Sequence, residues 1–156
     1  RYFEGKVPDA GRRGPVDLEQ ISAIGEQAAK AAENLDAFHF KAALGNVMDL
    51  ARRANGYFDA KQPWKQRKDD MAGCGTTINV CIQTVKALTV LMAPFLPFSA
   101  ARCARMLKLE TSDIPPWDSA TGELTAGHLL GEPAILFKKL DAVELFGEST
   151  KDKPAK

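Results

Sequence analysis

Apolar residues at helical spacing, interrupted by prolines, constrain the possible folds of this sequence more than any other feature. Residues 37–60 carry apolar side chains at i, i+3 and i+4 positions, which predicts one long amphipathic helix. Pro63 cannot continue such a helix, so a turn is expected at residues 61–64 and Trp64 should lie on a corner. The stripe expected to face the core consists of Phe40, Leu44, Val47, Met48, Ala51, Ala54 and Phe58.

Three more helices are predicted along the chain. Asp17 is a suitable N-cap for a helix at about 17–35, which has acidic residues in its first turn. Residues 70–93 also repeat at helical spacing, and their length favours a helix over a strand despite several β-branched residues. A short helix at about 98–108 follows, and because no stretch alternates long enough for a sheet, the fold class is all-α, a bundle of four main helices. The inward residues expected on the 70–93 helix are Ile78, Cys81, Val85, Leu88 and Met92.

The last third of the chain differs in composition from the rest. It is rich in Pro and Gly, which predicts a largely irregular C-terminal wrap over the bundle. Residues 147–156 are small, polar and charged, so we expect a linker or disordered tail after a domain over residues 1–146. The residues expected to order the wrap are Trp117, Leu129, Leu130, Ile135 and Phe137.

Composition excludes some classes of function. The chain has 156 residues, of which 45% are hydrophobic, enough for one domain with a core. A net charge of +1 argues against a general polyanion binder but allows a local basic patch. The chain has no uninterrupted apolar run of about twenty residues and opens with no signal peptide. The first observation predicts that no segment spans a membrane, and the second suggests an excised piece of a longer protein. The three widely spaced cysteines predict free thiols in a reducing compartment such as the cytoplasm.

No catalytic or metal-binding residues are predicted. His39 is interpreted as a partly buried or capping residue, and His128 as a structural residue of a loop. Cys74 and Cys81 share a helix face, which is core spacing and not the spacing of a zinc pair. Neither a phosphate-binding loop nor a nucleophile elbow is present in the sequence.

The stretch NGYFDAKQPWKQRK, residues 55–68, bears most directly on function because it surrounds a tryptophan with cations. Trp64 is either a core residue at a helix end, the usual environment of tryptophan, or an aromatic platform on a rigid corner. Such a platform stacks unpaired bases while neighbouring cations contact phosphates. The residue types alone leave both interpretations open. The surrounding cations are Lys61, Lys65, Arg67 and Lys68.

Three ordered motifs resemble the anticodon-binding helical domain of methionyl-tRNA synthetases. The first is FHFKAALGNVMDLARRANGYFDAKQPWKQRK at 38–68, with the family's Ala-Asn-x-Tyr-Phe/Val-Asp run followed by Pro-Trp. The second is LTVLMAPFLPFSAARCARML at 88–107, and the third is GHLLGEPAILFKKLD at 127–141. Together they cover nearly the whole chain in the family's order.

The resemblance implies an anticodon-binding helix bundle of a class I aminoacyl-tRNA synthetase. In this family the tryptophan of Pro-Trp stacks on an anticodon base of methionine tRNA, whose anticodon is CAU, and Trp64 matches that tryptophan. Asn55 and Pro63 are expected to support the backbone at the corner. The cations expected to contact phosphates or to be solvated are Lys61, Lys65, Arg67, Lys68 and Arg53.

The resemblance also implies that catalysis takes place in other parts of the parent enzyme and not in this chain. The parent enzymes join methionine to tRNA with ATP, but their nucleotide-binding signatures and zinc-bearing insertion are absent from this sequence, as are two upstream anticodon readers. ATP, and Mg or zinc, therefore belong to other parts of the parent, and no cofactor is expected here. The expected partners are methionine tRNA and the catalytic domain of the same chain, with no membrane. Two alternatives are the equivalent domain of a Leu, Ile, Val or Cys synthetase, and a structural helical module that buries Trp64.

Overall fold

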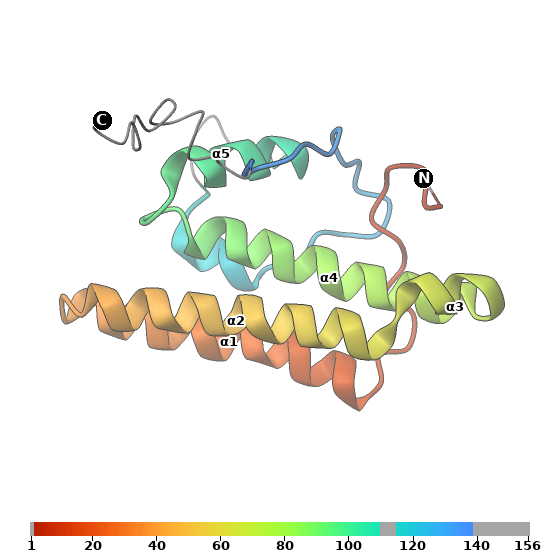
Figure 1. The fold of residues 1–156 in the computed structure, drawn as a ribbon, viewed down its shortest axis with the longest axis horizontal. Coiled ribbons are helices and arrows are strands. Elements are labelled where there is room, and N and C mark those ends of the chain that lie inside the picture. The colour runs from red at the N-terminus through yellow and green to blue at the C-terminus, as the bar shows by residue number, and fades with distance from the viewer. Residues whose placement is uncertain (1, 110–114, 139–156) are drawn as a thin grey trace, which may run out of the picture.

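The computed structural model of the chain describes residues 2–109 and 115–138, and over these residues the fold is helical (Figure 1). The only β pairing among them is an isolated antiparallel bridge between Lys6 and Leu129. The predicted all-α class is confirmed, whereas the predicted tail at 147–156 and the domain boundary before it lie outside the described residues. The helices are α1 (Pro15–Asp36), α2 (Phe40–Lys61), α3 (Pro63–Asp69), α4 (Met71–Leu91), α5 (Pro97–Met106) and the 3-10 helix η1 (Trp117–Thr121).

Prolines set the starts of three helices. Pro15, Pro63 and Pro97 each occupy the first position of a helix, where the missing N–H costs no hydrogen bond. The predicted start of α1 at Asp17 was two residues late, because Gly14 is the N-cap. Asp17 lies inside the first turn, where its Oδ2 accepts the Gly14 N–H at 2.8 Å.

The long helices form a layered bundle. Figure 1 shows α1 and α2 running side by side, α4 lying lengthwise along them, and α5 beyond α4. The short helix α3 extends past the end of the bundle, and the N-terminal residues lie at this same end (Figure 1). The core between α1, α2 and α4 is formed by Ala23, Ile24, Ala28, Ala31, Val47, Leu50, Ala87, Val90 and Leu91.

The predicted inward face of α2 was wrong in part. Val47 is fully buried, but Phe40, Met48 and Phe58 remain exposed. The face that packs on α1 and α4 is rotated from the predicted stripe, because it is centred on Ala43, Val47 and Leu50, and the Tyr57 ring is buried on it through its bond to Asp17. The buried residues of α2 are Ala43, Val47, Leu50 and Tyr57.

The predicted inward face of α4 was also wrong in part: Leu88 and Met92 pack against the core cluster as expected, although they are only partly buried. Val85 is exposed, whereas Thr77, Gln83 and Thr84 are buried. These polar side chains are buried because they form hydrogen bonds: the Gln83 amide, for example, bonds both the N–H and the C=O of Leu124. Among the described helices, α4 alone is long and apolar enough to cross a membrane, but 72% of that stretch is buried inside the bundle.

The C-terminal segment follows the predicted irregular path after η1. Trp117 packs against the core cluster, as expected. Leu129, Ile135 and Phe137 were expected to order the segment, but they are 53%, 72% and 64% exposed. Backbone hydrogen bonds to the N-terminal segment, such as Leu130 N–H to the Gly5 carbonyl at 2.7 Å, hold this region instead.

Candidate nucleic-acid interface

The corner between α2 and α3 is built around Gln62. This residue has φ 49° and ψ 58°, a left-handed conformation that ends α2 and lets α3 begin directly at Pro63. Its N–H donates to the Phe58 carbonyl at 3.0 Å, and its own carbonyl accepts the Lys65 N–H at 2.8 Å. The corner is therefore closed by backbone hydrogen bonds on both sides, so the residues that follow start from a fixed position.

Pro63 and the inner side of α3 attach the corner to α4. Pro63 is buried, and its carbonyl accepts the Cys74 thiol at 3.5 Å. The Gln66 side chain accepts the Thr77 hydroxyl at 2.9 Å. These contacts on one side of α3 leave the opposite side of this short helix facing solvent.

Trp64 lies on that exposed side, directly after the predicted corner but in the first turn of the helix α3, which was not predicted. Trp64 is 42% exposed, which disfavours the alternative of a structural module that buries this side chain. The Phe58 ring lies 5.4 Å from the Trp64 ring, centroid to centroid, at an interplanar angle of 51°. Phe58 thus supports the indole on one side while part of its surface remains open for another planar group.

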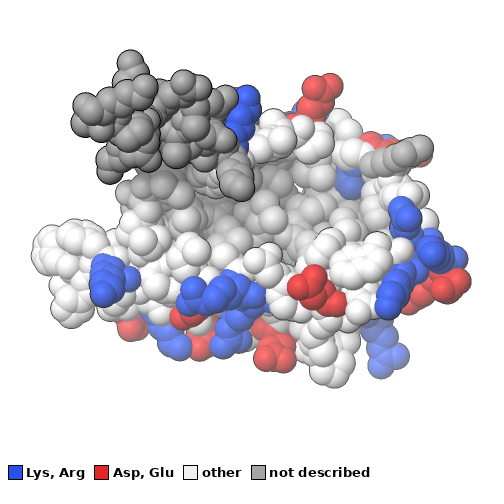
Figure 2. Space-filling model, in the orientation of Figure 1, with Lys and Arg blue, Asp and Glu red and all other residues white. Residues whose placement is uncertain are grey.

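Cations surround this exposed indole. Lys65, Arg67 and Lys68 are all exposed on α3, and Figure 2 shows Lys and Arg atoms gathered at the α3 end of the molecule, with some carboxylates among them. Arg67 and Lys68 follow Trp64 by three and four positions, so they share its side of the helix. Lys65 lies about 100° further around.

Arg67 is held in place by two contacts. Its Nε donates to the Trp64 carbonyl at 3.2 Å, and its Nη1 donates to the Tyr2 hydroxyl. The Arg67 Cζ lies 5.1 Å from the centroid of the Tyr2 ring, which is cation–π geometry. Sequence reasoning missed Tyr2, because nothing in the linear pattern connects residues 65 positions apart.

Lys61 has a partner that the sequence did not suggest. Its ammonium lies 2.9 Å from Oδ1 of Asp17, a residue that is only 2% exposed. The same Oδ1 accepts the Tyr57 hydroxyl at 2.7 Å. Lys61 therefore joins α2 to the start of α1 rather than pointing to solvent with the α3 cations.

This buried cluster shifts the pKa of both acidic partners. Burial alone would raise the pKa of Asp17, but the hydrogen bonds from Lys61, Tyr57 and Gly14 outweigh it and hold the pKa below its usual range. Burial and the bond to Asp17 raise the pKa of Tyr57 above its usual value, so the phenol remains a donor. The cluster fixes the last turn of α2, which carries the corner.

Arg53 and Asn55 lie on α2 and not on α3, where the indole and the other cations are. Arg53 lines a hollow between α1 and α2 with Glu19 and Tyr57, and it precedes Phe58 by five residues, about 140° around the helix. Asn55 is exposed on α2, three residues before Phe58. Its supporting role at the corner therefore stays a prediction.

The other sequence candidates are structural residues. His39 occupies the N-cap position of α2, as one of the two predicted roles required, but it is exposed and its side chain makes no capping hydrogen bond. His128 Nε2 lies 2.7 Å from the Leu107 carbonyl, a structural contact. The three cysteines have free thiols. No group of three or more His, Cys, Asp or Glu side chains among the described residues could hold a metal ion.

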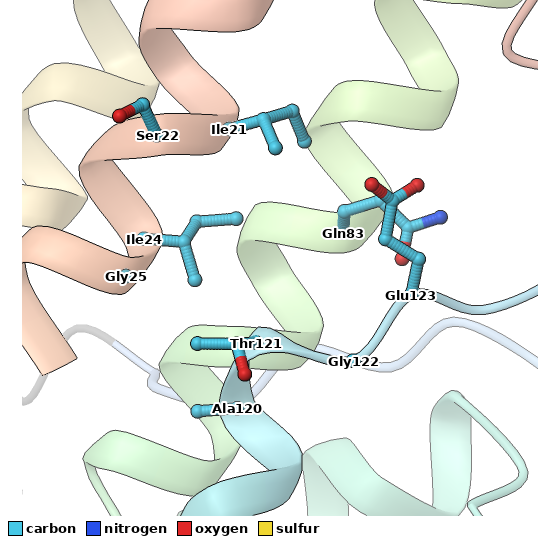
Figure 3. A pocket seen from close by; sticks show the side chains of 9 residues that line it. All are labelled: Ile21, Ser22, Ile24, Gly25, Gln83, Ala120, Thr121, Gly122 and Glu123. Carbon is cyan, nitrogen blue, oxygen red and sulfur yellow. The ribbon is translucent and has the colours of Figure 1, made fainter.

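A pocket between α1, α4 and residues 120–123 also lacks catalytic groups (Figure 3). Glu123 is its only ionisable lining residue, and both carboxylate oxygens bond the Arg13 guanidinium. The other polar side chains of the pocket are Ser22, Gln83 and Thr121. The Gln83 amide bonds the backbone of Leu124, and the Thr121 hydroxyl donates to the Asp118 carbonyl. The lining residues therefore serve to fix the C-terminal segment on the bundle.

An α-helical bundle that presents an exposed tryptophan among cations has the features of a domain that binds single-stranded nucleic acid. Comparison with known proteins is more specific. Residues 7–149 match the family described as the anticodon binding domain of methionyl tRNA ligase, and the chain belongs to this family.

Individual relatives agree with this assignment. The methionine–tRNA ligase of Pyrococcus abyssi is 41% identical over 140 residues, which cover 90% of this chain and 19% of the relative. The methionine–tRNA ligase of Bacteroides fragilis is 38% identical over 143 residues, which cover 90% of this chain and 21% of the relative. The chain therefore spans about a fifth of the length of these relatives.

Solved structures give the same result for the fold. The free methionyl-tRNA synthetase of Mycobacterium tuberculosis superposes with a TM-score of 0.84 at 25% identity, over 90% of this chain and 29% of that chain. The same enzyme in complex with methionyl-adenylate superposes with a TM-score of 0.82 at 26% identity, over 89% of this chain and 28% of that chain. The Leu, Ile, Val and Cys synthetases considered as alternatives are not favoured by these matches.

Proposed function

We propose that this chain reads the anticodon loop of methionine tRNA, with the CAU anticodon, as part of a methionine–tRNA ligase. The observation that carries the proposal is Trp64: it is 42% exposed, supported by Phe58, and lies on a helix whose other exposed residues include three cations. An unpaired anticodon base offers the planar surface that such an indole stacks on, and the loop phosphates offer the negative charge.

Each residue of the corner has a distinct part in this proposal. Trp64 stacks on a base, and Lys65, Arg67 and Lys68 contact the phosphates of the loop. Pro63 anchors the start of α3 through its buried ring, with Asn55 as a further support. Lys61 acts from within the fold, because its ammonium is engaged by Asp17. Arg53 is a more distant phosphate contact on α2.

The complete ligase would attach methionine to its tRNA with ATP, in the cytoplasm. The catalytic domain of the same chain would bind ATP and carry any Mg or zinc, since the signatures for these are absent from this sequence. This domain contributes specificity and no chemical step. By itself it should therefore give no methionine-dependent exchange of pyrophosphate with ATP, and exchange above background would contradict this division of roles.

A binding measurement tests the proposal. An RNA hairpin with the CAU loop should bind this chain more tightly than the same hairpin with a changed anticodon. With three α3 cations and Arg53 at phosphates, the logarithm of affinity should fall against the logarithm of salt with a slope of roughly −3 to −4. Equal binding of both hairpins, or binding insensitive to salt, would refute it.

A further inference from the structure

We propose that Tyr2 is a positioning residue for RNA binding: it holds the Arg67 guanidinium beside Trp64, ready to contact a phosphate of the bound loop. The inference rests on the proposed function and adds to it another aromatic residue, from the N-terminal end of the described chain. It is drawn from a pair of contacts between residues that lie 65 positions apart in the sequence.

The first part of the argument is that Arg67 is directed toward Trp64. The Arg67 Nε donates to the Trp64 backbone carbonyl at 3.2 Å, one turn earlier in α3. This bond ties the guanidinium to the backbone of the residue that carries the indole. A cation at this place can meet a phosphate next to a base that is stacked on Trp64.

The second part is that Tyr2 fixes the guanidinium in two ways. The Tyr2 hydroxyl accepts from Arg67 Nη1, and the Tyr2 ring lies under the guanidinium at 5.1 Å from Cζ to centroid. A guanidinium has five N–H donors, and these bonds use two. Among residues 2–109 and 115–138 no further hydrogen bond or salt bridge of Arg67 occurs, so three donors remain for a ligand.

The third part is that Tyr2 is itself anchored. Phe3 packs beside Gly75 of α4, and the Gly5 carbonyl accepts the Leu130 N–H at 2.7 Å. The Val7 N–H donates to the His128 carbonyl at 2.9 Å, which joins the same two segments again. The turn that carries Tyr2 is therefore fixed against the bundle, although the Tyr2 residue is 55% exposed.

The physical benefit is preorganisation. A free surface arginine must lose rotamer freedom when it binds a phosphate, and a residue that already orders it reduces this loss. An arginine also suits the role better than a lysine, since its planar fork can stack on Tyr2 and still bond a phosphate through its outer donors.

The experiment is a double-mutant cycle on binding of the CAU-loop RNA hairpin to this chain. Tyr2→Ala should weaken binding about two- to ten-fold, the cost of ordering one long side chain that Tyr2 no longer holds in the free protein. Arg67→Gln should weaken binding further. It should also make the slope of log affinity against log salt shallower by about 0.7–0.9, the value of one phosphate contact. Adding Tyr2→Ala to Arg67→Gln should then have no additional effect, because Tyr2 acts through Arg67.

Two controls make the outcomes distinct. Phe98→Ala removes another aromatic ring, 86% exposed on α5, and should leave binding unchanged. Trp64→Ala should weaken binding whether or not Tyr2 has the proposed role. If Trp64→Ala has no effect, the proposed function fails. If Trp64→Ala weakens binding but Tyr2→Ala does not, or if the two effects in the cycle simply add, the role of Tyr2 is overturned.

Discussion

Replacement of Asp17 by alanine should cost about 3 kcal/mol of unfolding free energy. The carboxylate is buried and accepts bonds from Lys61 at 2.9 Å, Tyr57 at 2.7 Å and Gly14 at 2.8 Å. Removing one partner of a buried charged pair costs about 3–5 kcal/mol. The lower end applies because the Lys61 side chain remains 24% exposed and can regain water. In urea, the unfolding midpoint should fall by about 1–3 M.

The same carboxylate makes part of the stability depend on pH. The pKa of Asp17 is lowered in the folded protein, so its stabilisation is present above the unfolded pKa of about 3.9 and is lost as the pH falls through the folded value. The stability difference between the wild type and Asp17→Asn should therefore be largest near neutral pH and shrink below about pH 4.

Glu19→Gln is the matched control for both measurements. Glu19 also lies in the first turns of α1, but it is exposed, and its replacement should leave the urea midpoint unchanged. Equal stability of the wild type and Asp17→Ala at neutral pH would refute the role of the buried cluster. A difference between wild type and Asp17→Asn that grows in acid would refute the sign of the pKa shift.

Two further predictions concern Trp117 and Cys81. Trp117→Ala should lower the unfolding free energy by about 3 kcal/mol, the lower end for a large core residue because Trp117 is only partly buried; an unchanged thermal melt would contradict its packing on the core. Burial raises the pKa of Cys81 to about 11, so iodoacetamide should modify it slowly in the folded chain at neutral pH and rapidly after unfolding; equal rates would show an accessible thiol.

The helix positions could be predicted from the sequence because local signals determine them. Prolines occupy the first position of α1, α3 and α5, and the four predicted ranges differ from α1, α2, α4 and α5 by only a few residues. The short helix α3 was not predicted, because only a break or turn was expected at its proline. The small error at α1 changed the assigned role of Asp17, since a shift of two residues turns an N-cap into a buried partner of Lys61.

The buried faces could not be predicted as well, because burial depends on all neighbouring elements. The centre of α4 is covered on several sides, so its apolar period did not distinguish an inner face from an outer face. Its buried polar residues depend on partners far along the chain, such as Gln83 on Leu124. Apolar periodicity alone cannot predict these contacts.

At the candidate site, too, features set by local sequence could be predicted and contacts between distant segments could not. The sequence identified Trp64 and the α3 cations, because a proline fixes the corner and these residues follow it directly. It did not identify Tyr2 as a partner of Arg67 or Asp17 as a partner of Lys61, since both pairs join distant segments. The support of the indole by Phe58 was missed because Phe58 was assigned to the core.

Replacement of Trp64 by alanine tests the central claim most directly. In the proposed full-length ligase, the variant should lose about 1–3 kcal/mol in kcat/KM for aminoacylation of methionine tRNA, the value of one base–aromatic stack. Methionine activation and the melting temperature should change little, because the indole is partly exposed and the activation step does not involve the anticodon. Normal aminoacylation by the Trp64→Ala variant would contradict the account, and so would unfolding of the domain by this substitution.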